Sequence, residues 1–580
     1  MATPIDNVPR APLGDEKIDE KVDVADEREL DEEKAHEDGY KQEGVRGVEA
    51  ITSVWTTKTL WITFALFYLV QFTDSLLQNS QSSLEPYVTS SFSQHGLLST
   101  TSVMSSIISG VSNLTIAKII DIWGRVEGLI VMVFLLVLGM LMKAVCQNVT
   151  TYAAAAVFYW VGHIGLGYVI SVFVADMTSL RNRAIIQGLL ATPTLGTVFA
   201  GPKIAEAFLL HSSFRWAFGA FCIILPVVCL PVIAVFWFNH KKAKQFGVAP
   251  VEPSGRTWTQ SVKHYVIEFD VLGMLLTTAG FSLVLLPLSL ASSSEDKWKS
   301  GSIIAMLVVG VICLIAFVIW EKYFAPIQYL PFKYLKDRTI LGACLAYFTM
   351  FASIYTWDIY LTSYLQVVNE VSISDAGYIL NSYSLTSSVI MPLTGVAIRY
   401  LGRPKWIALA AVPFATLGTA LLIHFRRPGV NVGYITMCQI FNGVSGGMIA
   451  SAMPISIMAA VSHQEVAVVL ALNSMFANIG VGVGLAISGG IWTNLLPVKL
   501  ATYLPPELKD QAGTIYGDIV TQLSYEWGSP AREAIVQSYG EVQRLMVIAG
   551  ACFMPLLFLA ILVWRDYNVK TIKQTRGNVF

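Results

Sequence analysis

Charged side chains are scarce in this sequence. Asp, Glu, Lys and Arg make up 14% of its 580 residues, whereas a soluble domain usually carries roughly 25%. Because hydrocarbon disfavours charge, this shortfall and the 54% share of hydrophobic residues together favour a membrane protein. The net charge of −1 also gives no electrostatic reason to expect a nucleic-acid partner.

Several chemical motifs are missing as well. The seven cysteines form no C-x-x-C pair and lie in or beside apolar segments, so we interpret them as small buried hydrophobes and expect neither a disulfide framework nor a metal site. The sequence has no loop of the G-x-x-x-x-G-K-[ST] type, which disfavours ATP-driven transport. It has neither zinc-type His/Glu spacing nor a nucleophile elbow, so we expect no enzyme and no cofactor.

The first fifty residues contain sixteen acidic and seven basic side chains and few large apolar ones. Such a segment cannot bury enough surface to offset its ordering entropy, so we predict a disordered acidic cytosolic tail over 1–55. It lacks the basic start and apolar core of a signal peptide. Its composition suits a solvated tail, and a regulatory segment is the alternative. Residues 566–580 are predicted to form a second cytosolic tail.

Long apolar segments dominate the rest of the chain. A membrane-spanning helix needs roughly 20 mostly apolar residues. Fourteen segments of about this length carry two charges or fewer, which predicts an all-α membrane protein with about fourteen transmembrane helices. The predicted spans are 59–79, 98–119, 128–146, 152–174, 184–208, 215–238, 270–291, 301–321, 339–364, 376–398, 405–425, 433–458, 467–493 and 545–564.

The charges of the loops predict the orientation of these spans. An even number of spans places both termini on one side of the membrane. If that side is the cytosol, the short inner loops hold fifteen Lys and Arg residues and the short outer loops hold four, as the positive-inside rule requires. The long outer loop over 494–544 is predicted to form a small cap. We expect a monomer in the plasma membrane, with an endosomal or vesicular membrane as the alternative.

Two of the predicted inner loops resemble each other. Residues 117–125 read AKIIDIWGR and residues 395–403 read GVAIRYLGR, each with a charge three residues before Gly-Arg. Glycine permits a sharp turn between helices. Each loop follows the second span of a group of six, which predicts an N-terminal half over 56–240 and a C-terminal half over 339–565. The linker over 241–338 then carries the two extra helices.

This organisation resembles the major facilitator superfamily, and two extra helices between the halves fit its fourteen-span branch. The stretches SLEPYV and SFSQH within 83–95, the loop 117–127 and ADMTSLRNR over 175–183 resemble the fungal siderophore–iron transporter family. The resemblance extends over residues 55–565. It implies import of ferric hydroxamate siderophores by proton symport through alternating access, with iron carried only inside the siderophore complex. A proton-coupled drug or glutathione exporter of the same superfamily is the main alternative, and a receptor that senses its ligand without moving it is another.

Polar residues within the first span are candidates for function, because burial of an ionisable group in hydrocarbon is costly. Gln71, Asp74 and Gln78 share one helical face and are predicted to line a cavity in which Asp74 could bind a proton. An inter-helix hydrogen bond is the alternative explanation.

Three further ionisable residues are candidates for proton coupling together with Asp74. His163 lies in the fourth span, at a place where the superfamily usually carries an arginine, and histidine titrates near neutral pH. Glu206 lies three residues after Lys203 in the fifth span, where the two could also form a purely structural pair. Asp358 occupies a position in the ninth span that corresponds to Asp74 in the first.

Aromatic side chains cluster around Asp358 in the ninth and tenth spans. We predict that they contact a bulky neutral ligand such as an iron–hydroxamate complex, and an interfacial aromatic belt is the alternative. The predicted contact residues are Tyr355, Trp357, Asp358, Tyr360, Tyr364 and Tyr383.

A second charged cluster is expected at the cytosolic ends of the second to fifth spans. Its opposite charges could hold the inner gate closed in the outward-open state, whereas the alternative is that they only set the topology. Its members are Asp121, Arg125, Asp176, Arg181 and Arg183.

Overall fold

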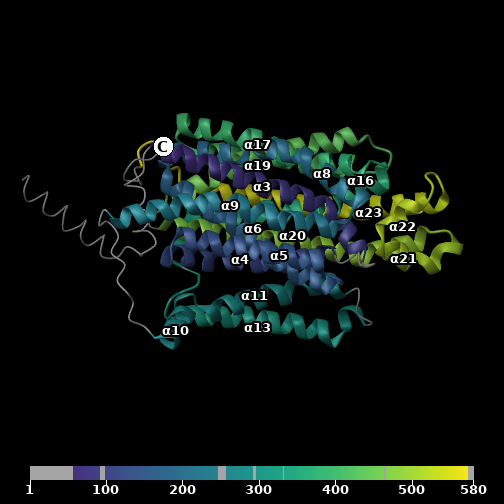
Figure 1. Cartoon of the computed structure of the whole chain (residues 1–580). Coiled ribbons are helices and arrows are strands. Elements are labelled where there is room, and N and C mark those ends of the chain that lie inside the picture. The colour runs from purple at the N-terminus through teal and green to yellow at the C-terminus, as the bar shows by residue number, and fades with distance from the viewer. Residues whose placement is uncertain are drawn as a thin grey trace, which may run out of the picture.

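A computed structural model describes residues 57–91, 98–245, 257–291, 296–330, 332–462 and 465–572. Every element in these ranges is a helix, and the long helices run side by side as one bundle (Figure 1). The first residues of α3 and the last described residues, 570–572, lie at the same end of the bundle, which we call the terminal end. The opposite end, which carries the lobe formed by α21 and α22, is the loop end. The predicted tail over 1–55 lies outside the described residues.

The N-terminal half crosses the bundle six times. Its fifth crossing consists of two helices, α7 and α8, which meet at Thr192 and Pro193. The elements of this half are α3 (Thr57–Ser90), α4 (Leu98–Ile122), α5 (Arg125–Val145), α6 (Val149–Met177), α7 (Leu180–Ala191), α8 (Thr194–His211) and α9 (Phe214–Gln245).

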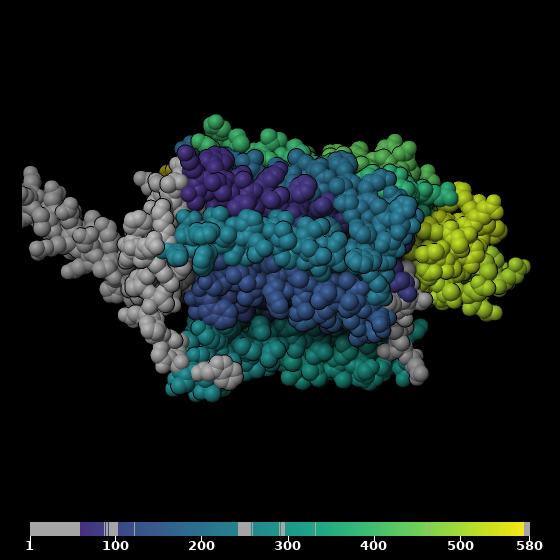
Figure 2. Space-filling model, in the orientation of Figure 1, coloured from purple at the N-terminus to yellow at the C-terminus, as the bar shows by residue number. Residues whose placement is uncertain are grey.

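The linker forms a separate pair of long helices along one edge of the bundle (Figures 1 and 2). In α13 the candidate span is only 17% buried, and exposed apolar side chains such as Val311 and Ile315 cover it. Such a surface suits contact with lipid tails. The linker elements are α10 (Trp258–Glu268), α11 (Val271–Leu285), α12 (Pro287–Leu290), η3 (Lys297–Lys299), α13 (Gly301–Tyr323) and α14 (Phe332–Leu335).

The C-terminal half again crosses the bundle six times. Its elements are α15 (Arg338–Asp358), α16 (Leu361–Asn369), α17 (Ile373–Leu401), α18 (Pro404–Phe425), α19 (Val432–Met458), α20 (Val466–Tyr503), η5 (Pro506–Gln511), α21 (Ala512–Gly517), α22 (Ile519–Ser524), α23 (Pro530–Ala551) and α24 (Met554–Leu562). Because α20 continues to Tyr503 and α23 begins at Pro530, the loop between them covers 504–529, which is shorter than the predicted 494–544. Its short helices form the lobe at the loop end (Figure 2).

Twelve described helices are long and apolar enough to cross a membrane, and the pair α10–α11, bent by 49°, makes thirteen if it forms one span. The more polar α17 lies outside this set although it has 29 residues. It buries Asn381 and Ser382 inside the protein, which accounts for a polar composition in a helix of full length. Counting α17 would give the predicted fourteen, and that total stays a prediction.

The two repeated loops contain the same backbone feature. Gly124 has a φ of 128° and Gly402 a φ of 76°, a region that residues with a Cβ atom rarely adopt. Gly124 separates α4 from α5, and Gly402 separates α17 from α18, so each glycine makes a tight connection between consecutive crossings. The predicted turn is therefore present in both halves.

Candidate functional site

Asp74 and His163 meet inside the N-terminal half. Asp74 lies near the middle of α3 and His163 near the middle of α6, and Nδ1 of His163 is 2.9 Å from Oδ1 of Asp74. Their side chains are only 5% and 13% exposed. A carboxylate and an imidazole in contact can share or exchange a proton, and burial makes their combined charge matter to the surrounding structure. The two residues, predicted separately from sequence, therefore form one ionisable pair.

The pair is held in place by its neighbours. The ring of Tyr159, one turn before His163 in α6, stacks parallel to the imidazole with the ring centroids 5.8 Å apart, and Trp160 approaches it edge-on at 5.3 Å. On the other side of α3, Ser75 contacts Thr197 of α8 through their hydroxyls at 2.7 Å. These contacts fix the two helices that carry the pair.

The polar face predicted on the first span is only partly enclosed. Asp74 and Ser75 are buried, Gln71 is half-buried and Gln78 is exposed. The structure therefore places Asp74 within the helix packing and leaves Gln78 accessible at the same face. A cavity-lining role for Gln71 and Gln78 stays a prediction.

In the C-terminal half, Asp358 ends α15 and is half-buried, as are Tyr355 and Tyr383. The Tyr383 hydroxyl packs against Gly446 of α19, where a Cβ atom would lie 2.3 Å from it. Asp358 lies close enough to Tyr355 and Tyr383 for its charge to affect both hydroxyl groups. Among the predicted contact residues, these three keep partly accessible surfaces.

The other predicted aromatic residues pack inside the C-terminal half. Tyr360 stacks on Trp492 with ring centroids 4.0 Å apart, and Trp357 and Tyr364 are also fully buried in the same apolar cluster. They form neither an exposed aromatic belt nor an open surface in this structure.

Arg426 is a buried charge that the loop-charge analysis treated as an outer-loop residue. The structure places it at the end of α18 with no exposed surface, where its Nη1 donates to the backbone oxygen of Trp357 at 2.8 Å. The guanidinium lies 5.2 Å from the centre of the Tyr364 ring, and its charge acts on Asp358. Arg426 is thus an internal partner of the ninth span.

Lys143 is a second buried charge that the sequence analysis did not select. It is the single charged residue of the predicted span 128–146, a signal that could have identified it. Its side chain is fully buried at the loop end of α5, with Nζ 4.2 Å from the centre of the Tyr159 ring. It therefore lies beside the residue that stacks on His163.

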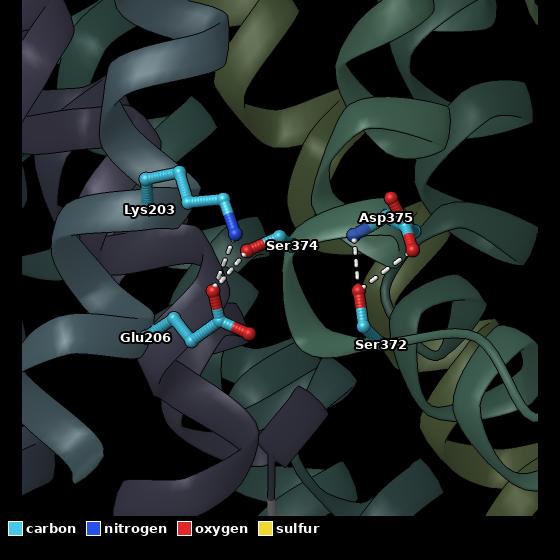
Figure 3. Close-up of polar contacts among 5 residues, drawn as sticks. All are labelled: Lys203, Glu206, Ser372, Ser374 and Asp375. Carbon is cyan, nitrogen blue, oxygen red and sulfur yellow. Dashed lines mark hydrogen bonds and ion pairs between the residues drawn. The ribbon is translucent and has the colours of Figure 1, made fainter.

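Glu206 joins the two halves near the loop end (Figure 3). Its Oε2 accepts a hydrogen bond from the hydroxyl of Ser374 in α17 at 2.6 Å and another from Lys203, one turn earlier in α8, at 2.9 Å. A second link is close by, where the hydroxyl of Tyr87 in α3 donates to Gln366 in α16 at 2.5 Å. Glu206 thus forms a contact between the two halves. It lies nearer to the loop end than the Asp74–His163 pair does.

At the terminal end, the predicted gate residues separate into different roles. Arg125 and Asp176 form an ion pair of 3.2 Å within the N-terminal half. Arg183 is buried, donates to the backbone oxygen of Ala175 at 2.8 Å, and reaches Met458 of α19 at 3.2 Å. Arg181 is exposed. The side chain of Asp121 lies outside the described residues.

In the described ranges, no three His, Cys, Asp or Glu side chains gather closely enough to hold a metal ion.

Two family models match parts of this chain. Residues 23–388 match the family model described as "Fungal trichothecene efflux pump (TRI12)", and residues 339–498 match the Major Facilitator Superfamily model. The chain is similar to "MFS siderochrome iron transporter 1" of Ajellomyces capsulatus, with 48% identity over 93% of this chain and 94% of the relative. It is 41% identical to "Siderophore iron transporter mirB" of Emericella nidulans, over 93% and 90% of the two chains.

Solved structures share the fold at low sequence identity. An auto-inhibited peptide transporter of the POT family superposes with a TM-score of 0.53 at 11% identity, covering 89% of this chain and 99% of its own. A bacterial homolog of the human lysosomal transporter Spinster, in an inward-facing and occupied conformation, gives a TM-score of 0.52 at 13% identity, over 88% and 97% of the two chains. These similarities concern the fold alone.

Proposed function

Because this chain belongs to the TRI12 family and to the siderophore iron transporters of the major facilitator superfamily, we propose that it imports ferric hydroxamate siderophores by proton symport. The proposed cargo is a bulky complex in which hydroxamate oxygens enclose the iron. The chain would act as a monomer in the plasma membrane, with both termini in the cytosol.

The buried Asp74–His163 pair is the observation that carries the coupling part of this proposal. A proton gained by the pair changes its net charge inside a poorly solvated bundle, where charge has a strong influence on which conformation is stable. A conformational change that alters access to the pair would therefore bind protons on one side and release them on the other. A pair that only held two helices together would not need a titratable group in both positions.

Contacts between the halves support alternating access. Near the loop end the halves meet through Glu206 and Ser374, and near the terminal end they meet through Arg183 and Met458. Two sets of contacts at opposite ends can open in turn while the bundles themselves stay rigid. In the proposed cycle, the loop-end set opens to the outside and the terminal-end set to the cytosol.

The half-buried group of Tyr355, Asp358 and Tyr383 is the proposed cargo contact in the C-terminal half. Tyrosine rings offer broad apolar faces together with hydroxyl groups, which suits a large complex with a polar outer shell. Asp358 would position a donor group of the siderophore or take part in proton coupling. Trp357, Tyr360 and Tyr364 would support this surface from behind.

Uptake by the purified chain in liposomes tests the function. With a more acidic exterior, a ferric trihydroxamate labelled with radioactive iron should accumulate inside, and a dye within the liposomes should report acidification that depends on the complex. Accumulation without acidification would reject symport, and binding without accumulation would indicate a receptor.

A proton-coupled exporter is the second candidate, favoured by the match to a family model named for an efflux pump. An exporter would use the same pair in the opposite direction. Loading the complex inside liposomes and recording its loss against an inward proton gradient separates the two directions.

A further inference from the structure

Lys143 belongs to a column of buried polar groups that leads from the loop end to the Asp74–His163 pair. Tyr152, Tyr159 and His163 are spaced by seven and four residues in α6, so they lie along one helical face. Asp74 and Glu85 are eleven residues apart in α3, the same separation as Tyr152 and His163. Since α3 and α6 run in opposite directions, Glu85 lies toward the loop end, as Tyr152 does. Eleven helical residues correspond to roughly 16 Å.

The groups of this column are close to one another. Nζ of Lys143 lies 5.1 Å from the Tyr152 ring and 4.2 Å from the Tyr159 ring, and the charge of Glu85 acts on Lys143. Glu85 also accepts a hydrogen bond from Gln81 at 2.9 Å. The Tyr159 ring then stacks on His163. A continuous series of polar side chains thus connects Glu85 with Asp74.

Three side-chain polar atoms that follow one another along the column have no hydrogen-bond partner among the described protein atoms. They are the hydroxyl of Tyr152, Nζ of Lys143 and the hydroxyl of Tyr159, and all three side chains are 2% exposed or less. A buried polar atom without a hydrogen-bond partner is unfavourable, so three such atoms along one column indicate that they have partners other than protein atoms. Bridging water molecules would satisfy all three and would also connect them.

We propose that Glu85, Lys143, Tyr152 and Tyr159 line a water-filled proton path from the loop end to the Asp74–His163 pair. A proton taken from outside water at Glu85 passes along the bridging waters, and the Asp74–His163 pair gains one proton. The positive charge of Lys143 favours the ionised form of Glu85, from which the proton has passed inward. This proposal rests on the proton symport proposed above and adds the route to it.

Other titratable or charged groups around the path lie on each helix that packs against it. Arg215 of α9 donates to the backbone oxygen of Ala144 at 3.3 Å, and Cys146 donates to that of Lys143 at 3.1 Å, so both are occupied near the loop end. Cys229 of α9 lies close enough to Asp74 for the charge of that carboxylate to affect its thiol. Tyr355 of the C-terminal half is likewise affected by the charge of Glu85. Lys143 is the basic side chain that lies against both tyrosines of the path.

Tyr159→Phe is the decisive variant, because it removes the hydroxyl and keeps the ring that stacks on His163 and faces Lys143. In liposomes with an acidic exterior, we expect it to reduce proton-driven accumulation of a radioactive ferric trihydroxamate by about tenfold or more. Exchange of the complex at equal pH moves no net protons, so exchange should stay within about twofold of the parent chain. Glu85→Gln should behave in the same way, and Lys143→Arg should retain more driven uptake than Lys143→Met.

Lys322→Met and Tyr323→Phe, two exposed positions of α13, are matched controls that should change neither activity. Equal losses of driven uptake and exchange in Tyr159→Phe would identify a structural role and overturn the path, as would unchanged driven uptake. If the parent chain accumulates the complex without proton movement, the symport proposal fails together with the path. If the parent is proton-coupled and Tyr159→Phe is unaffected, only the path fails.

Discussion

His163 and Asp74 lie 2.9 Å apart, one on α6 and one on α3, and the rings of Tyr159 and Trp160 flank the imidazole. In the proposed symport cycle the two residues act together as one unit, because each is the direct hydrogen-bond partner of the other. Substitutions of the two residues should accordingly fail to add.

Asp74→Asn and His163→Gln should each reduce pH-driven uptake of a ferric trihydroxamate by about a hundredfold, because neither amide can exchange a proton. The double variant should take up the complex about as fast as the less active of the two single variants, since the pair acts as a unit. Uptake in cells, normalised to the amount of protein at the surface, measures this. Losses that multiply in the double variant would show two independent sites.

Arg426→Leu should destabilise the C-terminal half, because the backbone oxygen of the buried Trp357 would lose its hydrogen-bond donor and Asp358 would lose a nearby positive charge. Leaving a buried acceptor without its donor typically costs about 1–3 kcal/mol. The double variant Arg426→Leu/Asp358→Asn should recover part of the lost stability. Thermal unfolding in detergent measures both, and Arg544→Leu, at an exposed position of the same half, should have little effect.

Asp358→Asn alone should lose accumulation while the protein still reaches the cell surface, since it keeps the size of the side chain and removes its charge. Radioactive uptake together with surface labelling measures this. Full transport by the variant would remove Asp358 from the coupling mechanism and leave it as a partner of Arg426.

Features that repeat along the chain were predictable from sequence, whereas partners across the bundle were not. The two glycine turns follow from a local pattern, and the structure shows that both Gly124 and Gly402 make these turns with a positive φ. Asp74 and His163 were each visible as unusual residues in apolar spans, but 89 residues separate them and only the packing of α3 on α6 shows that they touch. Spacing along one helix contains no information about the facing helix.

Burial at the ends of helices was the hardest property to predict. Arg426 follows directly after a predicted span, and loop charge alone assigns such a residue to water, yet it is fully buried. Trp and Tyr are the residue types that form interfacial belts, but Trp357, Tyr360 and Tyr364 are buried in the protein core. In both cases the lobe and α23 extend the buried region beyond the apolar segment that a hydropathy pattern detects.

Glu465 at the terminal end should make stability depend on pH. Burial opposes its charge, but hydrogen bonds from Lys333, Tyr334 and Ser462 outweigh burial and lower its pKa below the ordinary 4.5. A carboxylate with a lowered pKa stabilises the fold above that ordinary value and loses the effect as pH falls through the folded pKa. Glu465→Gln should therefore cost roughly 1 kcal/mol at pH 7, because Lys333 is exposed and its attraction is screened. The difference in unfolding temperature from the parent should shrink as the pH falls below 4.5 and disappear once Glu465 is protonated in the folded protein, and a difference that persists in still stronger acid would show another cause.

Closing the loop end covalently should stop transport. Glu206 and Ser374 contact each other from opposite halves through side-chain oxygens 2.6 Å apart, so cysteines at these two positions, in a chain whose seven natural cysteines are replaced, should be joined by a short bifunctional thiosulfonate cross-linker through reducible disulfide bonds. The bridge would hold the halves together at one end, and uptake of a ferric trihydroxamate should fall by about tenfold or more and return on reduction.

Cysteines at Lys203 and Glu206 are the matched control, because both positions lie in α8 and a cross-link there cannot join the halves. The control should transport equally with the cross-linker and after reduction. Alternating access requires the loop-end contacts to separate in every cycle, so the cross-linked protein cannot complete one. Full uptake by the chain with the 206–374 cross-link formed, as measured by loss of free thiols, would mean that the halves need not part at this end and would remove the outer gate from the mechanism.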